Sequence, residues 1–155
     1  MKAQYETIST SDDSSLACHA FSGPNYDCPY HFHPECEILR IDNSEGNTLI
    51  GDTFGEYHAG QWYLFGAGLP HLFQNHSPPP GTRHWARSRV IQFKSDCLGE
   101  AFFTQRETRH LSRLLKQAKR GLLFGAEVEP KGSRLLAGIF KAKGLKRLLG
   151  WLELL

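Results

Sequence analysis

The sequence predicts a mainly β fold, an antiparallel barrel or sandwich, followed by amphipathic α-helices toward the C-terminus. Two patterns support this fold class. Short apolar or alternating runs separated by Gly, Asn and Pro fill residues 5 to about 93, and apolar residues recur at helical spacing after residue 98. A chain of 155 residues can bury one proper core but not two independent ones. We therefore expect one compact β domain with a helical appendage.

The β part is expected to consist of short strands joined by turns. Turn residues separate the runs at 22–25, 42–46, 59–60 and 66–68, and the Pro-rich stretch 77–81 is expected to be a surface loop. Many short strands with frequent turns are typical of an antiparallel barrel or sandwich. The expected strands are 17–21, 31–41, 48–50, 62–65, 71–74 and 89–93.

Three amphipathic helices are expected after residue 98. The first spans 107–120 and ends at Gly121, and the pattern returns at 133–140 and at 145–155. Two glycines, Gly144 and Gly150, are expected to break the third helix. Such apolar stripes must be buried on the barrel, on each other or on a second copy of the chain. The stripe of the first helix is Leu111, Leu114, Leu115 and Ala118.

Charge divides the chain near residue 105. Residues 1–105 hold 6 Lys and Arg against 12 Asp and Glu, net −6, whereas 106–155 hold 12 against 4, net +8. A basic segment can contact nucleic acid, but here the charges alternate with leucines and are better explained as solvated helix faces.

The N-terminus lacks the apolar core of a secretory signal, and no window is apolar enough for a membrane span. A cytoplasmic protein without membrane contact is therefore expected. The four cysteines show no CxxC pairing and are expected to be free thiols, with no chemistry assigned to them. They are Cys18, Cys28, Cys36 and Cys97.

The segment around His31 concentrates the chemistry of the chain. In one β-strand, His31, His33 and Glu37 share a face because residues two apart point to the same side. If that face is the barrel interior, two imidazoles and a carboxylate lie in a medium where an unpaired charge is costly. A divalent metal (Zn, Fe, Ni, Cu or Mn) would satisfy them. Glu35 has the same parity as Glu37 and is the alternative carboxylate.

Two motifs in this chain resemble those of the cupin superfamily. The motif G-x5-H-x-H-x3-E-x6-G matches at His31, His33 and Glu37, with Asn25 at the opening glycine and the closing glycine displaced to Gly46. The motif G-x5-P-x-G-x2-H-x3-N has its proline replaced by Gly66, and it matches at Gly60, Gly68, His71 and Asn75. The resemblance implies a double-stranded β-helix, a six- to eight-stranded jelly-roll barrel, across roughly residues 15 to 95. It also implies a divalent transition metal (Zn, Ni, Fe or Mn) held by His31, His33, Glu37 and His71.

The flanking residues look like the N-terminal effector and dimerisation domain of AraC-type bacterial transcription regulators. The resemblance runs in order through His-Pro-Glu-Cys-Glu-Ile at 33–38, Ile-Gly-Asp at 50–52, Gly-Ala-Gly-Leu-Pro-His at 66–71, Val-Ile-Gln-Phe at 90–93, Leu-Gly at 98–99 and Lys-Arg-Gly-Leu at 119–122. It implies a barrel sensor domain over 1–98 and a helical dimerisation and linker segment over 99–155, packed on the barrel. A homodimer is expected through the leucine stripes, and the alternative is that these stripes pack only on their own barrel.

Family members continue into a pair of helix-turn-helix units that read DNA, and no recognition helix occurs before Leu155. The chain is therefore expected to be a sensor fragment or a truncated product. Any contact with DNA is expected from the absent units.

The function expected from this resemblance is binding of a small polar effector, such as a sugar or a related metabolite, in the barrel mouth. The runner-up is a metal-dependent cupin enzyme such as a dioxygenase or isomerase, for which the sequence offers no second carboxylate or base beside the metal. The third hypothesis is a structural barrel that binds no metal. The remaining histidines are expected at the surface: His19, His58, His76, His84 and His110. Aromatic side chains that could form stacking walls, or else core, are Phe32, Trp62, Tyr63, Phe65, Phe73 and Trp85.

Overall fold

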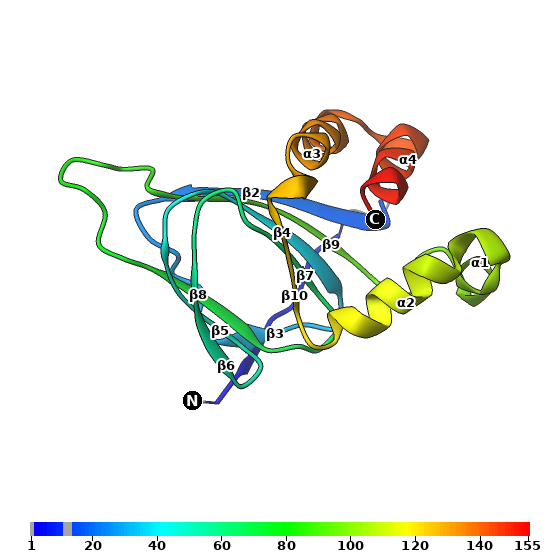
Figure 1. The fold of residues 1–155 in the computed structure, drawn as a ribbon, viewed down its shortest axis with the longest axis horizontal. Coiled ribbons are helices and arrows are strands. Elements are labelled where there is room, and N and C mark those ends of the chain that lie inside the picture. The colour runs from blue at the N-terminus through cyan, green and yellow to red at the C-terminus, as the bar shows by residue number, and fades with distance from the viewer. Residues whose placement is uncertain (1, 11–13) are drawn as a thin grey trace.

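The computed structural model describes residues 2–10 and 14–155 as a two-sheet β-barrel with helices packed on one sheet (Figure 1). This confirms the expected mainly β fold of two packed sheets with C-terminal helices. In spatial order, the first sheet contains β1 (Gln4–Tyr5), β3 (His31–Phe32), β8 (His71–Asn75), β5 (Gly46–Ile50) and β6 (Thr53–Tyr57). The second sheet contains β10 (Leu122–Phe124), β7 (Trp62–Phe65), β4 (Cys36–Asn43), β9 (Ala86–Phe93) and β2 (Leu16–Gly23).

The described residues contain two more strands than the upper limit of eight that the resemblance implies. The short strand β1 pairs in parallel with β3, and β10 pairs with the edge strand β7. β10 comes from the basic tail, so residues of the tail extend the wall of the barrel. The strand β6 also lay outside the expected set, whereas residues 76–85 form the long loop expected around the prolines (Figure 1).

The helices lie on the outer side of the second sheet (Figure 1). They are α1 (Glu100–Thr104), α2 (Arg109–Ala118), α3 (Lys131–Lys141) and α4 (Gly144–Leu154), with single 3₁₀ turns at Arg106–Thr108 and Ala126–Val128. Gly121, at φ 74°, follows the end of α2 as expected. The expected break at Gly150 is wrong, because α4 runs through it. A Cβ at that position would lie 3.1 Å from Ile139 Cγ1, so the glycine allows α3 and α4 to cross closely.

Alternate residues of the second sheet face two different cores, as the pleat of a strand requires. One set packs under the helices, with Ile38, Leu64 and Ile91 against Leu115, Leu136 and Trp151. The other set faces the barrel interior, with Leu39, Tyr63 and Phe65 against Phe73 of the first sheet. The sheet is thus a shared wall: the barrel interior lies on one side of it and the helices on the other.

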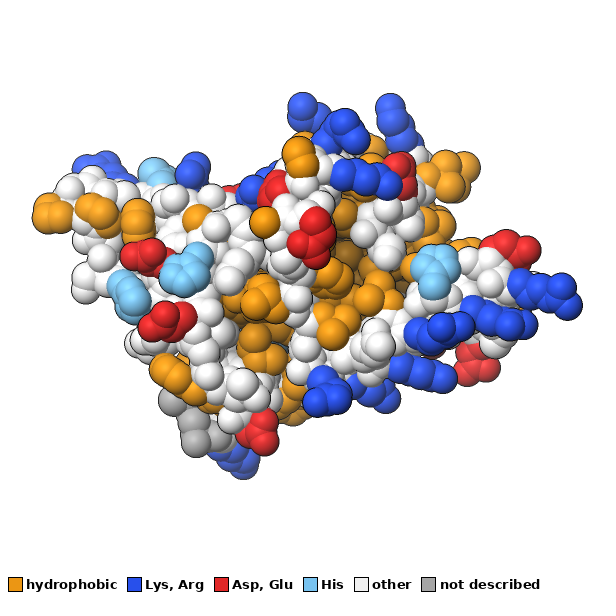
Figure 2. Space-filling model, viewed as in Figure 1, with side chains coloured by type: hydrophobic (Ala, Val, Ile, Leu, Met, Phe, Trp, Pro, Cys, Tyr) orange, Lys and Arg blue, Asp and Glu red, His pale blue; other side chains and the backbone are white. Residues whose placement is uncertain are grey.

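The helical layer is hollowed between α2 and the end of α4. A pocket of about 260 Å³ opens there over β4 and β7. Figure 2 shows apolar side chains gathered in this hollow and basic side chains along α2. The pocket is lined by Ile38, Trp62, Tyr63, Leu64, Leu114, Phe124, Val128, Leu154 and Leu155. We call it the outer apolar pocket.

The expected strand 31–41 is in fact two strands in different sheets. His31 pairs with His71 in the first sheet, whereas Glu37 pairs with Phe65 and Gln92 in the second. The chain crosses from one sheet to the other between β3 and β4. The prediction that one strand face carries the site residues is therefore wrong, although these residues do meet inside the barrel.

The turn after β4 departs from the motif in an informative way. Ser44 has φ 91°, so it occupies the left-handed conformation at the position where the motif places glycine. Gly46 is required for another reason, since a Cβ there would lie 2.2 Å from the backbone oxygen of Gln74. Gly46 therefore lets β5 approach β8, while Ser44 takes the turn conformation.

Candidate metal and ligand site

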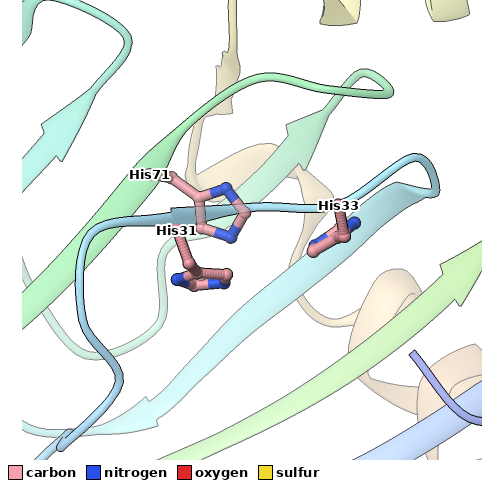
Figure 3. A group of neighbouring side chains, drawn as sticks. All are labelled: His31, His33 and His71. Atoms are coloured by element: carbon pink, nitrogen blue, oxygen red, sulfur yellow. The ribbon is translucent and has the colours of Figure 1, made fainter. Parts of the chain in front are cut away.

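Three histidines meet at one end of the barrel interior. His31 comes from β3, His33 from the crossing segment that follows, and His71 from β8 (Figure 3). All three are buried, and one ring nitrogen of each lies within 4.8 Å of the others. The rings of His31 and His71, which face each other across β3 and β8, have centroids 4.3 Å apart. Topology therefore brings the three expected histidines together.

A backbone carbonyl orients each of these rings. Because Nδ1 donates its hydrogen to a carbonyl in every case, Nε2 is the ring nitrogen left to bind a metal. Outer hydrogen bonds of this kind fix the orientation of metal-binding imidazoles. The bonds run from His31 to Pro29 O (2.8 Å), from His33 to Glu35 O (3.1 Å) and from His71 to Leu69 O (3.0 Å).

Glu37 brings a buried carboxylate to two of the three histidines. Its Oε2 lies 3.0 Å from His33 Nε2, and its Oε1 lies 3.7 Å from His71 Nε2. Gln92 Nε2 donates a hydrogen bond of 2.9 Å to the same Oε2. Glu37 is not within 4.8 Å of all three histidines, so it joins the triad from the side of His33 and His71.

The site has one favoured charge state without metal. Burial alone would raise the pKa of Glu37, but the hydrogen bond from His33 and the nearby imidazoles hold it at about 2. Burial would lower the pKa of His33, yet the hydrogen bond and charge of Glu37 raise it. Burial keeps the pKa of His71 below its ordinary value. Glu37 is therefore ionised, and its hydrogen bond to His33 favours the protonated form of that imidazole.

Glu35, the alternative carboxylate, occupies a different place. It precedes β4, and its Oε2 lies 3.7 Å from His33 Nδ1, on the back of the ring. That oxygen is buried without a hydrogen-bond partner. Of the two carboxylates, Glu37 therefore faces the metal-binding nitrogen of His33.

These donors fit a divalent transition metal. Three Nε2 atoms and a carboxylate are ligand types that Zn, Fe, Ni and Mn accept, and the burial supplies a low-dielectric setting in which a bound cation compensates the anionic Glu37. A metal would take the place of the proton on His33.

A cavity of about 430 Å³ adjoins the histidines. Of the aromatic residues considered as stacking walls, only Phe73 lines it; Trp62 lies under the helices and Tyr63 and Phe65 belong to the interior core. His19 is exposed, as expected, but it also lines the cavity.

The other residues that line the cavity are Glu6, Thr7, Ile8, Ser9, Phe21, Tyr26, Asp27, Cys28, His31, Glu37, Leu39, Ile41, His71, Ser88, Val90 and Gln92. Phe21 and Tyr26 were not anticipated, because their approach to the cavity depends on tertiary packing.

Solved structures of ToxT from Vibrio cholerae share the fold of this chain. Apo ToxT K231A from strain SCE256 matches with a TM-score of 0.56 and 13% identity, covering 92% of this chain and 53% of that one. ToxT from strain O395 bound to (E)-4-(8-methylnaphthalen-1-yl)but-3-enoic acid matches with a TM-score of 0.52 and 12% identity, covering 90% and 54%.

The fold is ToxT-like. The chain spans about half the length of the ToxT chains, and at this identity the likeness concerns the fold alone. A cupin 2 conserved barrel domain protein from Salinispora arenicola matches with a TM-score of 0.42 and 15% identity, covering 59% of this chain and 74% of that one. The sequence matches no protein-family model and no curated protein.

Among residues 2–10 and 14–155, no helix has the length and apolar character needed to cross a membrane.

Proposed function

We propose that this chain is the ligand-sensing and dimerisation domain of an AraC-type transcription regulator, with a small polar effector bound in the barrel cavity. ToxT is an AraC-family regulator, and the likeness to it spans the helices as well as the barrel. In this proposal the regulator is cytoplasmic, and DNA is contacted by helix-turn-helix units outside the present sequence. The cavity beside the histidines is the single observation that carries the proposal.

The lining of the cavity favours a neutral, hydroxyl-rich effector such as a sugar or a related metabolite. Acidic side chains of Glu6, Asp27 and Glu37 can accept hydrogen bonds from hydroxyl groups. Apolar side chains such as Leu39 and Phe73 offer a surface for the carbon skeleton. Among the lining residues of the described chain there is no Lys or Arg to neutralise a free carboxylate. A metal-bound effector would relax that restriction.

The proposed metal ligands are His31, His33, Glu37 and His71. A metal held by these residues would supply positive charge at the end of the cavity. The chain's own contribution is to orient the imidazoles through backbone carbonyls and to exclude bulk water by burying them.

A cavity-filling variant tests the location of the effector. Val90→Phe adds bulk to the barrel cavity, while Val128→Phe makes the same change in the outer apolar pocket. Titration calorimetry with a panel of sugars and polyols, supplemented by carboxylates, should find a ligand. We expect Val90→Phe to weaken its binding at least tenfold, about 1.4 kcal/mol, and Val128→Phe to leave it unchanged. Equal loss of binding in both folded variants would show that the effector does not bind in the barrel cavity.

The metal-dependent enzyme remains the second candidate because a buried metal-competent triad adjoins a cavity of ligand size. The two functions differ in the fate of the ligand. A sensor releases its effector chemically unchanged, and metal-loaded protein consumes no oxygen with it. Metal-dependent turnover in an oxygen-uptake or product assay would replace the sensor proposal with the enzymatic one.

The division into a sensor at 1–98 and a dimerisation segment at 99–155 is part of the proposal. The homodimer needs apolar surface that the chain does not bury itself. Leu145 and Leu149, one turn apart on α4, are 69% and 57% exposed. We therefore assign the homodimer contact to this face of α4 rather than to the buried stripes of α2.

A further inference from the structure

A second group of metal-binding side chains lies where the cavity meets solvent. Glu6, Cys28 and His31 place one donor atom each within 4.8 Å of one another, and all three line the cavity. Glu6 Oε2 is 3.2 Å from His31 Nε2, and Cys28 Sγ is 3.9 Å from the same nitrogen. Cys28 is an exposed free thiol. No local sequence pattern joins Cys28 with Glu6, which is 22 positions away.

Backbone contacts hold this group in place. The amide of Glu6 donates to Phe32 O at 2.9 Å, which docks the N-terminal segment along β3. His31 is itself oriented by its Nδ1 hydrogen bond to Pro29 O, one residue beyond Cys28. The three donors are thus supplied by neighbouring backbone segments that are tied to one another.

Glu6 faces the ring nitrogen of His31 that is free to bind a cation. His31 Nδ1 donates its hydrogen to Pro29 O, and Nε2 lies 3.2 Å from Glu6 Oε2. A proton or a metal ion between these two atoms would bind both. The thiol of Cys28 stands beside the pair as a third donor.

The spacing of Glu6 and His31 suits a tetrahedral metal site. Zinc bond lengths of about 2.0–2.1 Å to nitrogen and oxygen imply a separation of roughly 3.3 Å between N and O, and Glu6 Oε2 lies 3.2 Å from His31 Nε2. Cys28 Sγ lies 3.3 Å from Nδ1 and 3.9 Å from Nε2 of the same ring, so the side chain of this exposed residue must turn toward Nε2 to bind the same ion. A sulfur ligand favours soft and borderline ions.

We propose that Glu6, Cys28 and His31 form a second metal site at the cavity mouth, selective for zinc-like and softer ions, that shares His31 with the inner histidines. His31 has one free lone pair, so it serves one ion at a time. An ion at the mouth takes His31 away from His33 and His71. Solvent completes the coordination. The proposal does not depend on DNA regulation or on the identity of the effector.

Cobalt(II) is the probe, because a cobalt–thiolate bond gives a charge-transfer band in the near ultraviolet that imidazole and carboxylate ligands do not. Under reducing conditions, we expect CoCl₂ to produce this band in the wild-type chain. Cys28→Ser should abolish it and Glu6→Gln should weaken cobalt binding at least tenfold. Cys97→Ser, which removes a partly buried thiol outside this group, should retain the band.

The double variant His33→Ala/His71→Ala separates this site from the inner one. It keeps all three residues at the mouth, so the band should persist while metal held by the inner histidines is lost. A folded double variant that loses the band, a folded Cys28→Ser chain that keeps it, or a wild-type chain without it overturns the mouth site. Unchanged inner metal content in the double variant counts against the inner site only.

A second measurement needs no substitution. Wild-type protein is alkylated with iodoacetamide with and without CdCl₂, and each cysteine peptide is quantified by mass spectrometry. Cadmium should slow modification of Cys28 at least tenfold while the rates at Cys18 and Cys97 stay unchanged. Equal protection of these cysteines, or none at Cys28, contradicts the proposal.

Discussion

Glu129 Oε1 accepts a hydrogen bond of 2.7 Å from the indole Nε1 of Trp62. Arg40 Nε donates to the same oxygen at 2.8 Å, and Ser133 donates to the other. One carboxylate thus ties β4 and β7 of the barrel wall to the first turn of α3. The helical layer is joined to the barrel by directed polar contacts as well as by apolar packing.

Replacing this carboxylate should loosen the helical layer. Glu129→Gln removes charge-assisted hydrogen bonds to Arg40 and Trp62, and we expect it to lower the free energy of unfolding by about 1.5–3 kcal/mol. Glu127→Gln, on an exposed neighbour, is the matched control and should change stability little. Urea titrations of both variants measure the difference. Similar stability of the two would show that the contacts of Glu129 contribute nothing.

The effect of Glu129 should depend on pH. Burial would raise the pKa of Glu129, but the hydrogen bonds from Ser133, Trp62 and Arg40 lower it. A carboxyl whose pKa is lower in the folded state stabilises the fold above its unfolded pKa of about 4.3. The advantage of wild type over Glu129→Gln should therefore be full at neutral pH and shrink as the pH falls through the folded pKa. A constant difference down to strongly acidic pH would contradict this.

Gly46 should tolerate no side chain. A Cβ there would lie 2.2 Å from Gln74 O and 2.6 Å from Asn75 Cα, both backbone atoms of the neighbouring strand. We expect Gly46→Ala to destabilise the barrel by at least about 2 kcal/mol, in the range of overpacked cores. The control Gly138→Ala lies on α3 with open space around it and should stabilise by up to about 1 kcal/mol. Thermal melts should give the lowest melting temperature for Gly46→Ala, a higher one for wild type and the highest for Gly138→Ala.

Glu37 should matter for metal binding and Glu35 should not. Both carboxylates are buried near His33, but only Glu37 approaches Nε2. Glu37→Gln should lower metal affinity at least about tenfold, whereas Glu35→Gln should stay near wild type. Elemental analysis after equilibration with buffered metal compares them. A larger loss of affinity in Glu35→Gln than in Glu37→Gln would place the metal on the Nδ1 side of the His33 ring.

Metal occupancy should fall as the pH drops. Protons compete with the metal for His31, His33 and His71, whose ordinary pKa is about 6.5. The pKa of His33 is raised by Glu37, so competition begins on the alkaline side of this value. Metal content after dialysis should decrease from pH 8 to pH 5. Content that stays constant would exclude these imidazoles as the main ligands.

The buried stripe of α2 should control folding rather than association. Leu111 and Leu115 are 3% and 9% exposed and pack on the barrel wall, so Leu111→Lys/Leu115→Lys should unfold the chain instead of releasing monomers. Leu145→Asp/Leu149→Asp changes exposed positions of α4 and should leave the circular dichroism spectrum intact. If the homodimer uses this face, light scattering will show a monomer. A folded dimer in this variant removes α4 from the interface.

The sequence predicts that four residues meet inside the barrel because they belong to two compact motifs. His31, His33, Glu37 and His71 all lie together and buried, although the expectation of a single strand for residues 31–41 was wrong. Strand parity cannot reveal where a chain crosses between sheets. The role of these residues as metal ligands stays a prediction.

Other features depend on contacts that local patterns do not encode. β10 is three residues long in a basic, leucine-rich tail, and its strand conformation comes from pairing with β7. In the sequence, Gly150 looks like a helix breaker; its packing against Ile139 of α3 becomes clear only in the folded chain. The approach of Glu6 to Cys28 and His31 likewise requires β1 to pair with β3.

The barrel wall between the cavity and the helices is a single β-sheet. On β4, Glu37 faces the histidines while its neighbour Ile38 packs beneath the helices. Any ligand that shifts β4 must also change the free energy of helix docking, and by thermodynamic reciprocity the docking of the helices changes ligand affinity by the same amount. Substitutions under α2 and α4 are therefore expected to change the affinity for a ligand in the cavity, although these residues do not contact it.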